Sequence, residues 1–253
     1  MLNTVTLSGP DTLPALLIVH GLFGSARNWG VIAKKLSATR TVHAVDMRNH
    51  GDSPRGDSHT YADMAQDLGE VIAALGGPMD VLGHSMGGKA AMVLALTQPT
   101  LVNRLIVADI APMAYGHTQM PLIDAMQELD IKPLKSRRDA DTALSATVED
   151  PGVRAFLLQS LDLRASPPAW KLSLEVLRQD MPHILGWPGT EGRFEGGVLF
   201  LFGGASNYVT DAIRPVVRGM FPNVAFSEMP GVGHWLHAEA PGPFLEEVAG
   251  FLR

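Results

Sequence analysis

The stretch Met79-Asp80-Val81-Leu82-Gly83-His84-Ser85-Met86-Gly87-Gly88 decides the fold, because an apolar strand pattern runs directly into a helix pattern there. Its centre has the spacing Gly-x-Ser-x-Gly. In that arrangement the serine lies on a strained strand-to-helix turn with its hydroxyl clear of the sheet, and the glycines let neighbouring backbone pass closely. The amino end of the following helix points at the serine and can stabilise negative charge there. We therefore predict Ser85 as a nucleophile rather than an idle serine in a glycine-rich turn.

Short apolar runs alternate with helical patterns on both sides of this stretch. Strands are predicted at Ala15–Val19, Thr41–Val45, Met79–Leu82, Arg104–Ala108, Gly197–Phe202 and Val224–Glu228, with room for one more before Leu16. Helices are predicted at Trp29–Leu36, from a cap at Thr60 to Leu75, after Gly87, at Thr210–Met220 and at Pro243–Leu252. Strands that alternate with helices at this spacing predict an α/β fold with a mostly parallel, twisted sheet flanked by helices.

The alternation stops between Pro112 and Phe194, where no strand is predicted. Helical patterns in this block occur at Leu122–Leu129, Asp139–Val148, Val153–Leu161 and Ala169–Leu177. Such a block between two strands of one sheet is typical of an inserted helical cap. The predicted division is therefore a core of residues 1–111 and 195–253 and a cap of residues 112–194.

The composition fits one soluble α/β domain with an insertion, since the chain has 253 residues. Its net charge of -6 argues against a nucleic-acid partner. The chain contains no cysteine, which excludes disulfides and cysteine zinc sites. No histidine pair has a metal-ligand spacing such as His-Glu-x-x-His, so we expect no metal.

The amino-terminal segment lacks the basic region and the apolar run of a secretory signal. The apolar runs elsewhere are far shorter than the roughly 20 residues that a membrane span needs. We expect a cytoplasmic protein without a membrane span. The sequence leaves open whether it is a monomer or a homodimer.

A backbone site for a developing oxyanion is predicted in His20-Gly21-Leu22-Phe23-Gly24-Ser25, directly after the first buried strand. An N–H group from such a loop can act together with the N–H group of the residue after the nucleophile. We predict Leu22 and Met86 as the two donors, with Phe23 as the alternative to Leu22. An ordinary tight turn at a strand end is the competing interpretation.

The general base must come from a loop that reaches the carboxyl edge of the sheet. Gly231-Val232-Gly233-His234-Trp235 follows the last predicted strand, and its glycines permit an unusual backbone path. We therefore predict His234 as the base. His237 is expected near the start of the next helix, and His20 and His84 are expected to hold loops by hydrogen bonds.

The acid should lie between the serine and the base in the chain. The segment after the strand Gly197–Phe202 holds no carboxylate until Asp211. Asp109, however, directly follows the strand Arg104–Ala108, and an aspartate at an apolar strand end needs a partner to offset its burial. We favour Asp109 over Asp211. Ser206 can add a hydrogen bond to the acid or to His234, and an ordinary turn serine is an equally good interpretation.

Taken together, these motifs resemble the α/β-hydrolase superfamily, and more closely the bacterial YbfF-type esterases and their mitochondrial relatives. The resemblance rests on His20–Ser25, Asp46–Ser53, Gly83–Lys89, Asp109–Pro112 and Gly233-His234, in the family order and nearly from end to end. It implies a carboxylesterase or thioesterase without a cofactor. It also implies an acid after the earlier strand, as at Asp109, and a serine linked to the triad, as at Ser206. We expect Asp46–Ser53 to form a structural turn with no catalytic role.

The predicted function is a serine hydrolase that cleaves small-molecule esters or thioesters of short to medium acyl length through an acyl-enzyme. Phe23, Phe156 and Trp187 are the candidates for substrate contact, although most apolar cap residues should form the core of the cap itself. One alternative is a C–C bond hydrolase or a perhydrolase with the same triad. Another is a non-catalytic ligand-binding protein on the same fold.

Overall fold

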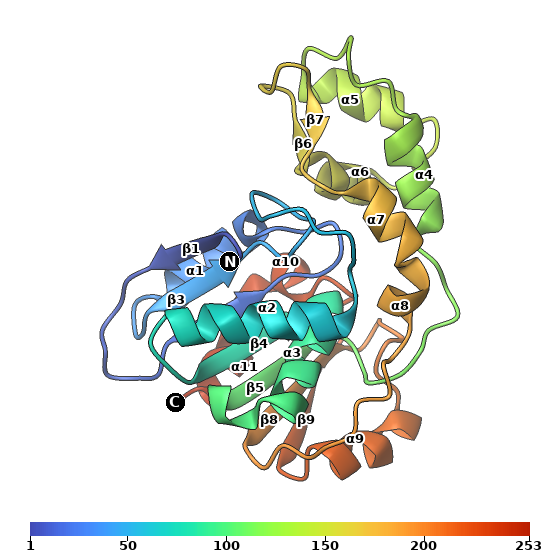
Figure 1. Ribbon diagram of the computed structural model, residues 1–253. Helices are drawn as coiled ribbons and strands as arrows, with labels where there is room; N and C mark the ends of the chain where they lie inside the picture. The colour runs from blue at the N-terminus through green and yellow to red at the C-terminus, as the bar shows by residue number, and fades with distance from the viewer.

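The computed structural model describes all residues from 1 to 253. Its centre is a seven-stranded sheet in the order β1-β3-β2-β4-β5-β8-β9, in which only β1 runs antiparallel to its neighbour (Figure 1). The strands are β1 Thr4–Leu7, β2 Leu16–Val19, β3 Val42–Val45, β4 Met79–His84, β5 Val102–Ala108, β8 Gly197–Gly203 and β9 Val224–Met229. The predicted α/β fold with a mostly parallel sheet is confirmed, and the strand expected before Leu16 is β1.

Helices cover both faces of the sheet, because the central strands are apolar on both sides. Every residue of β2, β3 and β4 is buried. One core cluster of 45 buried residues contains α2 Tyr61–Ala74, α3 Met86–Thr97 and part of α9 Arg214–Met220. A second cluster of 19 buried residues lies on the opposite face and contains α1 Gly30–Leu36 and α11 Pro241–Phe251. The flanking helices thus enclose the parallel strands, as such sheets require.

Shorter helices complete this part of the molecule. They are the 3₁₀ helices Ala26–Trp29, Pro99–Leu101 and Asp211–Ile213 and the short α10 Leu236–Glu239. Thr60 caps α2 as expected, since its hydroxyl oxygen accepts a hydrogen bond from the Asp63 N–H group. No helix is both long enough and apolar enough to cross a membrane.

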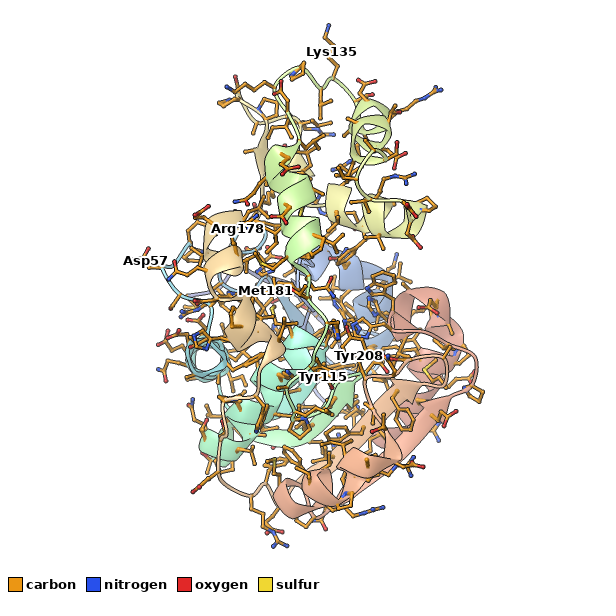
Figure 2. All side chains as sticks on the ribbon, turned by 90° about the vertical axis from the view of Figure 1, so that its right-hand side faces the viewer. Asp57, Tyr115, Lys135, Arg178, Met181 and Tyr208 are labelled. Carbon is orange, nitrogen blue, oxygen red and sulfur yellow. The ribbon has the colours of Figure 1, made fainter.

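The segment between β5 and β8 forms a separate helical layer at one end of the sheet, where it rises above the strands (Figure 1). Its elements are α4 Met120–Glu128, α5 Arg137–Leu144, α6 Pro151–Leu158, β6 Leu161–Asp162, β7 Ala169–Trp170, α7 Leu174–Gln179 and α8 Met181–Leu185. We call this layer the cap. Figure 2 shows Lys135 at its far tip.

Two sequence expectations for the cap are wrong. The segment contains a small hairpin, in which Leu161 pairs with Trp170 and Asp162 with Ala169. The helix expected at Ala169–Leu177 therefore begins only at Leu174, after β7. Strands of two residues are too short to show an alternating pattern, so the sequence carries no readable signal for them.

The register of the sheet brings the first residues of three loops, those after β2, β4 and β5, to one edge of the sheet. Gly83 on β4 pairs with Val19 on β2, and His84 pairs with Ala108 on β5. Because these strands are parallel, the residues that follow them emerge side by side at their carboxyl ends. The loops after Val19, His84 and Ala108 begin with His20, Ser85 and Asp109, so the topology gathers the predicted site residues.

Candidate active site

Ser85 lies on a strained turn between β4 and α3. Its backbone dihedrals are φ 53° and ψ −121°, which a residue with a side chain rarely adopts. The turn is possible because the flanking glycines let backbone approach closely. A Cβ atom on Gly83 would lie 2.4 Å from the carbonyl oxygen of Gly87, and one on Gly87 would lie 2.5 Å from that of His20. The Gly-x-Ser-x-Gly spacing is thus a steric requirement of this turn.

Ser85, His234 and Asp109 form a continuous hydrogen-bonded chain. The Ser85 Oγ atom is 3.1 Å from His234 Nε2, and His234 Nδ1 is 2.7 Å from Asp109 Oδ2. The carboxylate is fully buried, whereas the imidazole is partly exposed. With Nδ1 donating to the carboxylate, Nε2 is the acceptor that faces the serine hydroxyl. The predicted nucleophile, base and acid therefore lie within contact of one another.

Asp109 also accepts hydrogen bonds from two further groups. The Gly203 N–H group donates to Oδ1 at 3.0 Å, and the Ser206 hydroxyl donates to Oδ2 at 2.5 Å. Its φ of 51° is another strained backbone angle at this edge of the sheet. The alternative acid, Asp211, instead pairs with Arg214, and its side chain is 90% exposed. Geometry therefore favours Asp109 over Asp211 as the predicted acid, and the Ser206 hydroxyl contacts Asp109.

Tyr208 and His84 hold the imidazole of His234 in place. The Tyr208 ring stacks on that imidazole, with ring centroids 4.2 Å apart and an interplanar angle of 20°. His84 Nε2 donates to the carbonyl oxygen of His234 at 2.9 Å, and burial lowers the pKa of His84 well below its usual value. Tyr208 is itself fixed, since the Tyr115 hydroxyl donates to its carbonyl oxygen at 2.8 Å. Figure 2 shows Tyr115 and Tyr208 together beneath the cap.

The two predicted oxyanion donors, Leu22 and Met86, differ from Phe23 because their N–H groups are not taken up by a hydrogen bond in their own loop or helix. The Leu22 N–H group makes no hydrogen bond within the protein. Met86 is the first residue of α3, a position whose N–H group has no partner within the helix. The Phe23 N–H group, in contrast, donates to His50 Nε2 at 3.1 Å. Of the two loop candidates, only Leu22 has a free donor.

A cavity of about 360 Å³ opens onto Ser85 and His234. Its walls come from the core and the cap together and are mostly hydrophobic. The cap contributes Leu122, Val153, Phe156, Ile184 and Leu185 to this lining. Two of the three predicted contact residues, Phe23 and Phe156, line the cavity. Trp187 does not, and packs partly buried against the main core cluster instead.

Sequence reasoning missed Lys89 and Trp235, which both line the cavity. The Lys89 side chain is almost fully buried, and its ammonium donates to the Leu185 carbonyl oxygen at 3.0 Å. It also lies 4.8 Å from the centre of the Tyr115 ring. Burial lowers the pKa of Lys89 to about 7. Its place in the helix directly after Gly87-Gly88 was the one available signal.

The predicted turn Asp46–Ser53 is held by its own polar groups. The Asp46 carboxylate accepts hydrogen bonds at 2.8 Å from the Ala26 N–H group and at 2.9 Å from the Asp52 N–H group. Gly51 has a φ of 55° and lies against that carboxylate, so a side chain there would collide with it. No group of three or more histidine, aspartate or glutamate side chains is arranged to hold a metal ion.

Several known proteins of similar sequence or structure are named as esterases or lipases. Residues 16–247 match the alpha/beta hydrolase family. The chain is 39% identical to the sn-1-specific diacylglycerol lipase ABHD11 of Mus musculus, over 97% of this chain and 83% of that protein. It is 36% identical to esterase YbfF of Escherichia coli, over 94% of this chain and 92% of that one.

A solved structure, a marine microorganism esterase, superposes with a TM-score of 0.94 at 35% sequence identity and covers 99% of both chains. The match of fold thus extends to the cap as well as the sheet. Together with the family match over residues 16–247, these similarities establish that the chain belongs to the alpha/beta hydrolase family.

Proposed function

We propose that this protein is a serine esterase or thioesterase that hydrolyses short to medium acyl groups through an acyl-enzyme, an EC 3.1-class activity. The observation that carries the proposal is the chain of contacts from Ser85 Oγ through His234 to Asp109, at the wall of an apolar cavity. A hydroxyl, a base within hydrogen-bond reach and a buried acid that orients the base are the parts that acyl transfer needs.

In the acylation half, His234 Nε2 accepts the proton of Ser85 Oγ as that oxygen bonds to the carbonyl carbon. The carbonyl oxygen becomes an oxyanion, and the N–H groups of Leu22 and Met86 donate to it. His234 then gives its proton to the departing alcohol or thiol, and the acyl-enzyme forms. Asp109 holds the imidazole tautomer and stabilises its charged form throughout.

In the deacylation half, His234 accepts a proton from water, whose oxygen attacks the acyl carbon. The second oxyanion collapses, His234 returns the proton to Ser85 Oγ, and the carboxylic acid leaves. The mechanism needs no cofactor. The same five residues therefore serve both halves.

We further propose that residues 112–194 act as the cap that closes the acyl pocket over the core formed by residues 1–111 and 195–253. Support comes from the cap side chains on the cavity wall, among them Phe156, whose ring centre is 5.9 Å from that of Trp235. Walls that are mostly hydrophobic suit an uncharged acyl chain better than a charged group. Phe23 and Phe156 are the residues we expect to contact it.

The names of the relatives favour ester hydrolysis over the alternatives. The mouse relative is named as a lipase of diacylglycerol and the Escherichia coli relative as an esterase. A C–C bond hydrolase or a perhydrolase would use the same triad, and a non-catalytic binding protein would keep the cavity without turnover. The cytoplasmic location, the monomeric or homodimeric state and the absence of a nucleic-acid partner stay predictions.

A panel of p-nitrophenyl esters and matching coenzyme A thioesters of graded acyl length tests the proposal. We expect turnover that peaks at short to medium chains and disappears in Ser85→Ala. The ratio of ester to thioester kcat/KM then separates the two substrate classes. Absence of turnover by the folded wild-type protein on every member, or equal turnover by Ser85→Ala, would contradict the proposal.

A further inference from the structure

Phe23 is held at both ends of its backbone by groups outside its own loop. Its φ is 63°, a left-handed value that costs free energy for a residue with a bulky side chain. Its N–H group donates to His50 Nε2 at 3.1 Å, and its carbonyl oxygen accepts from the Ser160 hydroxyl at 2.9 Å. Such a conformation persists only where the surroundings fix it. His50 and Ser160 supply that constraint.

The neighbouring peptide unit, between Gly21 and Leu22, is fixed as well. The Gly21 carbonyl oxygen accepts from the Gly24 N–H group at 3.0 Å and lies 2.8 Å from His20 Nδ1. In a trans peptide the N–H group points opposite to the carbonyl oxygen. Since that oxygen is turned into the loop, the Leu22 N–H group is turned out of it. Leu22 lines the cavity, where its N–H group is unbonded.

His50 is suited to accept a hydrogen bond, because it stays neutral. Its Nδ1 atom donates to the Arg48 carbonyl oxygen at 2.9 Å, which leaves Nε2 as the acceptor. Burial, followed by the nearby His20 and His59, lowers the pKa of His50 well below its usual value. The turn that we expected to be only structural therefore reaches the oxyanion loop through His50.

Ser160 belongs to the cap, and the cap contacts both the oxyanion loop His20–Ser25 and the turn Asp46–Ser53. Ser160 follows α6, is buried, and accepts a hydrogen bond from Lys171 N–H through its carbonyl oxygen at 2.7 Å. A bridge links Leu172 to His50, and the Ser173 N–H group donates to the Asn49 carbonyl oxygen at 2.9 Å. One face of the cap thus contacts Phe23 directly and the turn that carries His50.

We propose that His50 and the cap residue Ser160 are positioning residues for the oxyanion loop, so that the docked cap completes the oxyanion hole. They hold the two peptide units around Phe23, and the loop then presents the Leu22 N–H group to the substrate. The cap contributes to the chemistry as well as to the pocket. This inference rests on the proposed function, since it assumes that an oxyanion forms beside Leu22.

The test compares Ser160→Ala, His50→Leu and His50→Gln with the wild type on a p-nitrophenyl ester. Losing one oxyanion donor outright costs about 10²–10³ in kcat. We expect about a tenfold lower kcat for Ser160→Ala, about a hundredfold lower kcat for His50→Leu, and little change in KM, because misplacing a donor is a partial loss of it. His50→Gln should recover part of the rate, since its amide oxygen can accept from Phe23 N–H.

Two readouts separate positioning from general damage. A trifluoromethyl ketone, which forms a tetrahedral oxyanion on the serine, should lose affinity by the same factor as kcat/KM. Burst titration should show an unchanged fraction of active enzyme. Ser136→Ala is the matched control, because Ser136 caps a cap helix through the Asp139 N–H group and is not a neighbour of Phe23. Its kcat should equal that of the wild type.

Unchanged kcat and ketone affinity in Ser160→Ala and His50→Leu would overturn the inference and leave the esterase proposal intact. An equal loss in Ser136→Ala would also overturn it, because the cause would then be a weakened cap. If the wild-type protein itself hydrolyses no ester and forms no ketone adduct, the proposed function fails. The wild-type arm therefore distinguishes the two failures.

Discussion

The two ends of the central sheet each bury a carboxylate, and they use it in different ways. Asp80, near the amino end of β4, accepts from Arg40 Nη1 and Arg104 Nη2, both at 2.7 Å. Asp109, just beyond the carboxyl end of β5, accepts from His234 Nδ1 at 2.7 Å. Both carboxylates are completely shielded from solvent. Burial alone therefore does not distinguish a carboxylate that supports the fold from one that we expect to support chemistry.

The difference lies in the partner. Arginine keeps its charge at every relevant pH, and the two guanidinium groups also donate to the Leu252 carbonyl oxygen near the carboxyl terminus. They tie the last helix to the sheet. The imidazole of His234 can gain and lose a proton, and its second nitrogen faces Ser85. We therefore expect the chemistry at the end where the partner of the carboxylate can exchange a proton with the Ser85 hydroxyl.

The largest expected effect is a loss of activity when Asp109, rather than Asp80, is replaced. Asp109→Asn should lower kcat by about 10⁴, by analogy with the acid of a serine-protease triad, because the imidazole loses its orientation and its counter-charge. Steady-state kinetics on a p-nitrophenyl ester measures this. Full activity in Asp109→Asn together with loss in Asp211→Asn would show that the acid is misassigned.

The opposite pattern is expected at the amino end of the sheet. Asp80→Asn leaves two arginines beside an uncharged amide, and breaking a buried pair in this way costs about 3–5 kcal/mol of stability. Urea unfolding measures the loss, and kcat per folded molecule should stay within about twofold of the wild type, since no part of the triad changes. A large fall in kcat at full stability would erase the distinction between the two ends.

Asp109 has three hydrogen-bond partners, namely His234, Gly203 and Ser206. The effect of removing Ser206 tests whether its hydrogen bond to Asp109 matters for activity. Removing one hydrogen bond to a charged carboxylate, in Ser206→Ala, should lower kcat by about tenfold. Ser227→Ala is the matched control, since its hydroxyl donates to the exposed Glu247 carboxylate at 2.9 Å. Equal kcat in both variants would leave Ser206 an ordinary turn serine.

The smallest expected effect is a loss of folding stability at low pH. Buried histidines lie at the Ser85 end of the sheet, whereas arginines lie at the Asp80 end. Burial lowers the pKa of His237 to about 4, and its ring stacks on Trp29 with centroids 4.0 Å apart. Between that pKa and the ordinary 6.5, the unfolded chain binds the proton and the folded protein does not, so stability falls as pH falls.

From pH 7 to 5.5 this one group should cost about 1 kcal/mol of unfolding free energy. His237→Phe keeps a ring against Trp29 and has no proton to bind. Urea unfolding at the two pH values should therefore show a smaller acid loss in this variant than in the wild type. An identical loss in both would mean that His237 does not contribute.

The sheet and the meeting of Ser85, His234 and Asp109 at one edge of it were predictable from sequence, because each rests on a local signal. Buried parallel strands are continuous apolar runs, and the elbow at Ser85 needs its glycines at fixed spacing. Asp109 was predictable because a lone carboxylate at an apolar strand end requires a partner. The choice between Leu22 and Phe23, in contrast, depends on which N–H group His50 binds, and that contact joins loops 27 residues apart.

The cap was the least predictable part for the same reason. Its hairpin strands are two residues long. Phe156 lies on the cavity wall and Trp187 does not, and this difference depends on how the cap packs on the core. Lys89 lies in a helix of mostly buried residues. Its ammonium binds the carbonyl oxygen of Leu185, which is 96 residues away in the chain. Such long-range contacts leave no pattern in the local sequence.

Labelling with a fluorophosphonate probe, located by mass spectrometry of the peptides, tests the central claim most directly. The probe bonds to a serine whose hydroxyl an adjacent base activates. We predict a single modified residue, Ser85, with labelling slowed in Asp109→Asn and unchanged in folded Asp80→Asn. An unlabelled wild-type protein that is folded, or a label on another serine, would contradict the account.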